Sequence, residues 1–359
     1  MTAAPSAPEA GSPRFGVWSL VYGTVASLHH RDDPVDASWE RNRAQIVEAE
    51  RLGYDCTLVA QHLINPIRED LDQLETWTAC AALAEATERI EIIAAIKPPL
   101  FHPVVAAKMA LQIEQISRGR FAINFVNAWF RPELEQAGIE FREHDQRYEY
   151  GTEWLTVVES LMRGVSTTHH GVHFQVESYT LRPPSDWRPR PRIYAGGESP
   201  PALKLVGALA DDWLLNGQPL EDVVAKIETM RASLVAPRSV RFGLSAFVIA
   251  RSSDALAQDA LQEAWKLAER DRAAYAAMLA RKDSAASATR ASIGTNGGTA
   301  AGLVGDYDTV AQRICDFHDA GVTTFLVQFQ PFEAEMARFA HEVMPRVRER
   351  IAARAGSPR

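Results

Sequence analysis

The feature of this sequence that most restricts its fold is a regular alternation of short apolar segments with longer segments of helical period. The apolar segments predict eight strands, at residues 15–22, 54–60, 90–97, 120–127, 192–197, 212–217, 240–250 and 322–329. They are apolar on both sides rather than alternately apolar and polar, which is typical of strands buried on both faces of a parallel sheet. Nearly every one precedes a predicted helix, and this number of repeats favours a closed (β/α)8 TIM barrel, an α/β fold, over an open doubly wound sheet.

Helical periodicity predicts the helices between these strands, at residues 37–52, 74–88, 103–117, 147–163, 201–210 and 220–234. Insertion segments follow strands four and seven. The first holds a polar loop at 128–146 and a hairpin at 166–191, and the second spans 254–305 and ends in a stretch rich in Ser, Ala and Gly. We expect a single barrel domain at 14–350 with a mobile lid at about 282–303, preceded by a disordered tail at 1–13 and followed by a tail at 351–359.

Composition and charge argue against several other classes of protein. An apolar content of 46% offers a sizeable core, which excludes a disordered chain. Three cysteines without CxxC spacing form no disulfide framework, zinc knuckle or redox pair, and we interpret them as core thiols of a cytoplasmic protein. A net charge of −8 without a Lys/Arg tract argues against nucleic acid and anionic membrane as partners. The sequence contains neither a secretory signal nor the ~18 consecutive apolar residues of a membrane helix.

The residues that follow the predicted strands carry the candidate chemistry, because the loops at the C-terminal ends of barrel strands converge on one site. These positions are Gln61, His62, Lys97, Asn124, Asn127, Trp129, Arg131, Glu133, Gly196, Gly197, Glu198, Ser199, Asn216, Gln218 and Gln330. The set is rich in amides and has no paired-carboxylate, Ser-His-Asp or metal-ligand signature. Three histidines in the predicted hairpin, His169, His170 and His173, are interpreted as surface residues, so no metal is expected.

The turn from Gly196 to Ser199 is the clearest candidate for an anion site. Two glycines let the backbone approach a ligand closely, and Ser199 can cap the following helix and donate to a phosphate. Two prolines at the start of that helix remove backbone N–H donors, so side chains must help. Arg147 and Tyr148 at the start of another helix can do so. On spacing alone, an ordinary βα turn and a solvated helix start stay open as alternatives.

Several longer motifs carry a resemblance to a known family. They are GYDCTLVAQH, IIAAIKPPLFHPVVAAKMALQIEQISRGRFAINFV, NAWFRPELEQAGIEFREHDQRYEYGTEWLTVVESLMRG, IYAGGESPPALKLVGALADDWLLNG and GLVGDYDTVAQRICDFHDAGVTTFLVQF. In this order they resemble the bacterial luciferase-like flavin-dependent monooxygenases, in the branch of the dimethylsulfone, alkanesulfonate and pyrimidine enzymes. Together they cover most of residues 14–350.

The resemblance implies a (β/α)8 barrel that receives reduced FMN from a separate NAD(P)H-dependent flavin reductase and reacts it with O2. It implies a homodimer or homotetramer. The positions that it assigns to cofactor binding are Gln61, His62, Asn124, Glu133, Arg147, Tyr148, Gly197, Glu198 and Ser199. Asn124, His62 and Trp129 are the expected catalytic residues, and Trp18, Trp129 and Phe130 the expected walls of a pocket that excludes water.

Departures from the alkanesulfonate pattern bear on the substrate. Ser245 and Phe247 stand where that branch has Arg and His, Asn296 stands at its lid Arg, and Asn65 stands near its active-site Cys. The loss of charge-assisted donors argues against a sulfonate and for a small neutral substrate, although Arg281, Lys282 or Arg290 can restore a positive group. The resemblance to the dimethylsulfone branch then implies an organosulfur substrate and C–S cleavage. The alternatives are alkanesulfonate desulfonation, pyrimidine-type ring or amide oxygenation through a flavin N5-oxygen species, a deazaflavin-dependent reductase, and a non-catalytic flavin-binding barrel.

Overall fold

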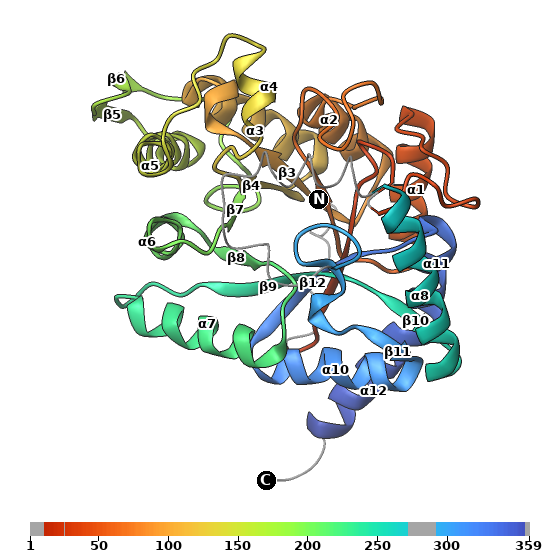
Figure 1. Ribbon diagram of the computed structural model, residues 1–359. Helices are drawn as coiled ribbons and strands as arrows, with labels where there is room; N and C mark the ends of the chain where they lie inside the picture. The colour runs from red at the N-terminus through yellow and green to blue at the C-terminus, as the bar shows by residue number, and fades with distance from the viewer. Residues whose placement is uncertain (1–10, 25, 272–291, 356–359) are drawn as a thin grey trace.

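The computed structural model describes residues 11–24, 26–271 and 292–355. Eight strands close into a barrel in the order β1-β12-β9-β8-β7-β4-β3-β2, and all neighbouring pairs are parallel (Figure 1). These strands are β1 Arg14–Trp18, β2 Cys56–Val59, β3 Glu91–Ile96, β4 Phe121–Phe125, β7 Arg192–Gly196, β8 Asp212–Leu215, β9 Arg241–Phe247 and β12 Val322–Gln328. The predicted (β/α)8 barrel is therefore confirmed, with its strands in the predicted places.

Helices surround the barrel and connect its strands. They are α1 Trp39–Arg51, α2 Thr76–Ala86, α3 Pro103–Ser117, α5 His144–Met162, α6 Pro200–Leu209, α7 Leu220–Ser233, α10 Tyr307–Asp319, α11 Phe332–Arg338 and α12 Met344–Ala355. Short helical segments lie at η1 Pro98–Leu100, α4 Arg131–Glu135, η3 Gly298–Ala301 and η4 Phe339–Val343. Helix α3 shows how the sequence fixes such bounds: Pro103 occupies the first turn, and Arg118 ends the helix in the left-handed region at φ 56°.

The prediction of one strand at 240–250 is wrong, because the structure divides this segment into two strands. The chain leaves the barrel at Val248 and continues as β10 Ile249–Arg251, which pairs in parallel with β11 Val304–Asp306. Helix α8 Asp254–Arg270 lies in the connection between the two. The hydrogen bonds show where the strand divides. Val248 N–H still donates to the Gln328 carbonyl of β12 over 3.0 Å, whereas Ile249 N–H donates to the Leu303 carbonyl over 3.0 Å. The strand thus changes partners within one residue.

The first insertion contains the predicted hairpin, formed by β5 Thr167–His170 and β6 Gln175–Tyr179 in antiparallel pairing. In Figure 1 it lies at the edge of the molecule beside α5, on the opposite side from α8, β10 and β11. The predicted loop 128–146 contains the short helix α4, and α5 begins at His144 rather than at the predicted residue 147.

The expected lid and tails lie partly outside the residues that the structure describes. Residues 282–291 and 1–10 lie outside the described residues. Residues 292–303 pack on the barrel, where Thr295 N–H donates to Gln328 Oε1 over 3.0 Å and Gly217 N–H donates to the Asn296 carbonyl over 2.8 Å. Within the segment expected as a C-terminal tail at 351–359, α12 continues to Ala355 and Ile351 packs against the core.

The interior of the barrel is charged at its N-terminal end. Arg14 lies 2.8 Å from Glu91, whose carboxylate also accepts from the Tyr194 hydroxyl over 2.8 Å. Arg192 lies 3.6 Å from Glu91 and 3.9 Å from Asp212. Arg241 completes the network at 2.6 Å from Asp212. We call these six residues the basal network. None of the helices in the described ranges is long and apolar enough to cross a membrane.

Candidate functional site

At the C-terminal end of the barrel, Lys97, His62 and Glu133 form a buried cluster. Lys97 follows β3, His62 follows β2, and Glu133 comes from α4. The Lys97 ammonium donates to Glu133 Oε2 and lies 3.0 Å from His62 Nδ1. Backbone N–H of Leu63 donates to the other oxygen of Glu133. All three side chains of the cluster are at most 7% exposed, so their interactions take place away from bulk water.

Burial and charge set the protonation of this cluster. Burial lowers the pKa of Lys97 to about 8, although the nearby Glu133 carboxylate opposes the change. Burial acts to raise the pKa of Glu133, but the hydrogen bond with His62 and the charge of Lys97 outweigh it and lower the pKa to about 2. Near neutral pH the cluster therefore holds an ammonium and a carboxylate.

Two buried amides beside this cluster leave polar atoms unsatisfied. Gln61 Oε1 accepts from the Lys97 backbone N–H over 2.9 Å, which places that amide at the ends of β2 and β3. Its Nε2, and Oδ1 of Asn124 in β4, have no hydrogen-bond partner among the described residues. Gln61 is 2% and Asn124 6% exposed. Because a buried polar atom without a partner costs free energy, these atoms indicate a bound group.

The predicted anion site is assembled from two loops. A Cβ added to Gly197 would lie 2.9 Å from the Tyr148 hydroxyl, and φ of Gly197 is 100°, so only glycine fits easily. Ser199 occupies the N-cap position of α6 without a side-chain capping bond to that helix. Burial raises the pKa of Tyr148, and the neighbouring Ser199 hydroxyl opposes the change. Tyr148, Gly197 and Ser199 are thus brought together as expected.

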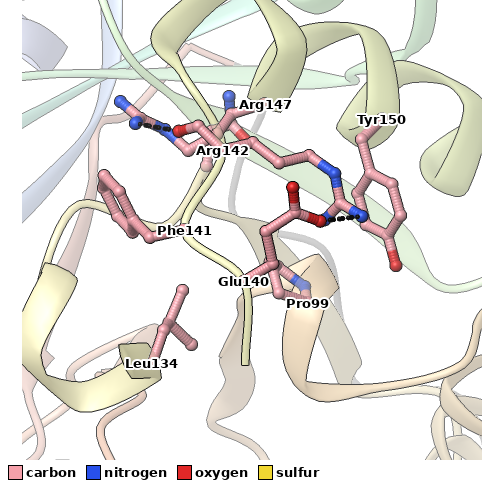
Figure 2. A pocket seen from close by; sticks show the side chains of 8 residues that line it. Pro99, Leu134, Glu140, Phe141, Arg142, Arg147 and Tyr150 are labelled. Carbon is pink, nitrogen blue, oxygen red and sulfur yellow. Dashed lines mark hydrogen bonds and ion pairs between the residues drawn. The ribbon is translucent and has the colours of Figure 1, made fainter. Parts of the chain in front are cut away.

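Arg147 lies at one side of this group in a small pocket (Figure 2). Its guanidinium donates to the Arg142 carbonyl over 2.8 Å and lies 4.4 Å from the centre of the Phe141 ring. Arg142 in turn covers the Tyr150 ring at 4.4 Å and pairs with Glu140 at 2.8 Å. The two arginines hold the loop before α5 in place, and they bring positive charge to the start of that helix.

The Glu198 carboxylate is bound by side chains and backbone of the β8 turn and α7. Its carboxylate accepts from Asn216 N–H over 3.1 Å and from Gln218 Nε2 over 3.4 Å, and it pairs with Lys226 of α7 at 2.5 Å. These bonds tie the β7 turn to the β8 turn. The structure therefore gives Glu198 a protein partner on the side of α7, whereas its expected contact with the cofactor stays a prediction.

The other predicted positions lie in different surroundings. Trp129 and Phe130 pack edge-on against the His62 ring, with centroid distances of 5.5 and 5.9 Å. His169 pairs with Glu153 at 3.2 Å on the hairpin. Asn65 is used structurally, because its amide donates to the Asp72 carbonyl over 2.9 Å. In the described ranges, no group of three or more His, Cys, Asp or Glu side chains is placed to hold a metal.

Two further side chains in the barrel interior carry buried polar atoms. Ser245 in β9 is 4% exposed and Trp18 in β1 is 9% exposed. Neither the Ser245 hydroxyl nor the Trp18 indole N–H meets a hydrogen-bond partner within the described chain. Both are neutral donors. Phe247, two residues after Ser245 on the same strand, adds an apolar surface.

Sequence reasoning noted Lys97 after the third strand but assigned it no role. The signal was present, since a lysine that ends a largely apolar strand is expected to be buried and paired. Its partner could not be identified, because Glu133 lies 36 residues further along the chain.

Known proteins share sequence and fold with this chain. The sequence profile of the family described as luciferase-like monooxygenase matches residues 18–324. An FMNH(2)-dependent dimethylsulfone monooxygenase from Pseudomonas putida is 31% identical over 94% of this chain and 95% of its own length. A protein of the same name from Pseudomonas fluorescens (strain Pf0-1) is 30% identical over 96% and 97%. The crystal structure of DmoA from Hyphomicrobium sulfonivorans superposes with a TM-score of 0.78 at 18% identity, covering 94% of this chain and 88% of that one.

Proposed function

Because the chain belongs to the luciferase-like monooxygenase family, we propose that it uses reduced FMN and O2 to oxygenate a small, neutral organosulfur molecule. The curated relatives, about 30% identical over nearly their whole length, are FMNH(2)-dependent dimethylsulfone monooxygenases. The enzyme is thus a flavin-dependent monooxygenase of the oxidoreductase class.

The observation that carries this proposal is the pair of unsatisfied amides, Gln61 and Asn124, at the same end of the barrel as the glycine cradle of Gly197. FMN has a polar ring edge that needs donors and acceptors, and an anionic phosphate that needs donors and positive charge. Gln61 and Asn124 suit the ring, while Ser199, Tyr148 and Arg147 suit the phosphate. The residues present therefore fit the cofactor.

Bound reduced FMN supplies the two electrons by which one oxygen atom of O2 enters the substrate and the other becomes water. The protein contributes binding, orientation and exclusion of water. Trp18, Trp129 and Phe130 provide the apolar walls, and the buried Lys97–Glu133 pair keeps the charge beneath them balanced. Residues 292–303, which pack over the ends of β8 and β12, narrow the entrance.

A neutral substrate is favoured by the donors on β1 and β9. The hydroxyl of Ser245 and the indole of Trp18 can donate to the oxygens of a sulfone, which carries no net charge. A sulfonate would need charge-assisted donors when buried, and Ser245 and Phe247 supply none. The chain is accordingly proposed to act with a separate flavin reductase and as a homo-oligomer.

The test is an anaerobic titration of the protein with reduced FMN, followed by mixing with 18O2 and dimethylsulfone, methanesulfonate or uracil in parallel. We expect saturable FMN binding and incorporation of one 18O atom into a product from the sulfone. Binding without any O2-dependent product would contradict the proposal. Product from methanesulfonate or uracil alone would instead establish one of the alternative substrates.

A further inference from the structure

Residues 293–299 form a compact turn at the C-terminal end of the barrel, which we call the mouth turn. The turn closes on itself, because Thr299 N–H donates to the Ile293 carbonyl over 3.0 Å and Ile293 N–H donates to the Thr299 hydroxyl over 3.1 Å. The Ile293 side chain is 3% exposed and belongs to the main hydrophobic core. The mouth turn is therefore an ordered part of the barrel wall.

Gln328, the last residue of β12, binds the mouth turn through both ends of its side-chain amide. Its Oε1 accepts from Thr295 N–H over 3.0 Å, and its Nε2 donates to the Thr295 hydroxyl over 2.8 Å. Gln328 is fully buried, so the loss of these bonds would leave polar atoms of the amide without a partner and away from water. The amide thus holds Thr295 in one place and one orientation.

The mouth turn also contacts the loop after β8 and the end of β9. Gly217 N–H donates to the Asn296 carbonyl over 2.8 Å. A Cβ added to Gly297, where φ is 84°, would lie 2.0 Å from the Gly217 carbonyl oxygen, so the two backbones touch without room for a side chain. A Cβ on Gly294 would lie 2.6 Å from Cδ2 of Phe247. The turn is therefore held against β8, β9 and β12, which are neighbours in the barrel.

The mouth turn and the residues proposed to hold FMN lie on different parts of the barrel end. Gln61 follows β2, Asn124 lies in β4 and Ser199 follows β7, and these strands belong to the run β7-β4-β3-β2. The mouth turn covers the run β12-β9-β8 instead. It lies next to the strand that carries Ser245 and Phe247, where the proposed function places the substrate.

We propose that Gln328 is a positioning residue that fixes the mouth turn as the wall of the substrate site on the side of β8, β9 and β12. A fixed wall keeps a small substrate, rather than water, beside the flavin. Gln328 therefore affects the substrate more than the cofactor. This role in turnover rests on the proposed function, whereas the fixed place of the mouth turn does not.

Hydrogen exchange of the full chain without FMN measures how firmly the turn is held. The segment 292–303 contains the backbone N–H groups of Thr295, Gly298 and Thr299, all of which donate hydrogen bonds. We expect slow exchange in the wild type and exchange at least about 10-fold faster in Gln328→Met, which keeps the size of the side chain but not its amide. Exchange in α3 is the internal control and stays unchanged. Exchange of 292–303 in the wild type as fast as in an unstructured peptide, or an unchanged rate in Gln328→Met, would overturn the proposal.

A matched pair of variants tests the same contact from the side of the turn. Thr295→Val loses the hydroxyl that accepts from Gln328, whereas Thr295→Ser keeps it. We expect the mouth turn to exchange about 3- to 10-fold faster in Thr295→Val than in Thr295→Ser. Equal rates would refute the role of the Gln328 side chain, and this comparison applies even where Gln328→Met fails to fold.

Turnover of dimethylsulfone with reduced FMN gives the functional readout. We expect Gln328→Met to raise the KM for the sulfone by roughly 3- to 10-fold, with the affinity for reduced FMN within about 3-fold of wild type. A larger share of O2 should take both electrons and two protons from reduced FMN and leave as hydrogen peroxide, without oxygenating the substrate.

A variant with faster exchange but unchanged KM and peroxide yield would refute the role of Gln328 in the substrate site. A fall in FMN affinity at unchanged KM would refute it as well. If the wild-type protein shows slow exchange of the mouth turn but oxygenates no substrate, the proposed function fails, while the positioning of the turn by Gln328 stands.

Discussion

The two ends of the barrel interior both bury charged groups but satisfy them differently. At the N-terminal end, each charge of the basal network faces an opposite charge within 4.0 Å, as with Arg14 and Glu91 at 2.8 Å. At the C-terminal end, the Lys97–Glu133 pair lies beside amides whose outer atoms have no partner in the described chain. A closed network serves stability, whereas open polar atoms in a dry site serve a ligand. Substitutions at the two ends should therefore affect different measurements.

The largest effect is expected from Glu91→Gln, which leaves Arg14 and Arg192 buried without their shared carboxylate. Breaking a buried ion pair in this way costs about 3–5 kcal/mol of unfolding free energy. Urea denaturation measures the loss, and FMN affinity of the remaining folded protein should stay at the wild-type level. Glu263→Gln on the surface of α8 is the control and should change neither quantity. A clear drop in FMN affinity with Glu91→Gln would contradict the view that the N-terminal end of the barrel serves stability alone.

Acid pH should weaken both ends through the same mechanism. In the folded protein the pKa of Glu91 and that of Glu133 are each lowered from 4.5 to about 2. Burial opposes this lowering in both. For Glu91 the charges of nearby arginines outweigh it, and for Glu133 the hydrogen bond with His62 and the charge of Lys97 do so. A lowered folded pKa contributes stability that is complete above pH 4.5 and is lost as the pH falls toward 2. Each group contributes on the order of 3 kcal/mol.

Between pH 4.5 and 2 the free energy of unfolding of the wild type should therefore fall steeply with falling pH. The fall should be smaller for Glu133→Gln and for Glu91→Gln. Only Glu133→Gln should also weaken FMN binding. An unchanged slope in both variants would contradict the assigned pKa values.

Gly197→Ala tests the ligand end by a smaller change. The new Cβ would lie 2.9 Å from the Tyr148 hydroxyl and from the Ala202 Cβ, at a φ of 100°. We expect a loss of about 1–3 kcal/mol from backbone strain, and a loss of at least about 10-fold in FMN affinity because Tyr148 is displaced. Gly53→Ala is the matched control, since Gly53 has φ 86° but open space around its Cβ. If both variants bind FMN equally well, Gly197 is a simple turn residue.

Ser245→Ala should have the smallest effect on stability. Its hydroxyl is buried and has no partner in the described chain, so its removal should change the free energy of unfolding by less than about 0.5 kcal/mol. Turnover of the sulfone should nevertheless show a KM raised by roughly 3- to 10-fold, because a donor to the substrate is lost. A lower KM in Ser245→Ala would remove Ser245 from the proposed substrate contacts.

The strands and helices of the barrel were predictable because burial on both faces gives each strand an apolar run that local reasoning can detect. Helix α3 was predicted with its observed bounds, since Pro103 and the Arg118–Gly119 turn mark its ends. The division at Val248 was not predictable. Residues 240–250 are mostly apolar and show no break at Val248, and the change of partner from Gln328 to Leu303 depends on segments far away in the sequence.

The candidate site was predictable as a set of positions but not as a set of bonds. Strand ends identified Gln61, Asn124 and the Gly197 turn, and the start of the next predicted helix identified Tyr148. Pairing over long sequence separations was not visible: Glu198 bonds to Lys226, 28 residues away, and Lys97 bonds to Glu133. Such pairs follow from the three-dimensional arrangement of the βα loops rather than from any local pattern.

The pairing of β10 with β11 has a consequence for how the protein can change in length. Ile249 and Arg251 are in register with Val304 and Asp306, so the chain departs from the barrel and returns to it along one short ladder. A peptide inserted between α8 and η3 lengthens a loop whose ends are already held together by this pairing. The entropic cost of closing such a loop rises only logarithmically with its length. This connection is therefore a place where a foreign peptide, a reporter or a fluorescent label could be inserted with a small loss of stability.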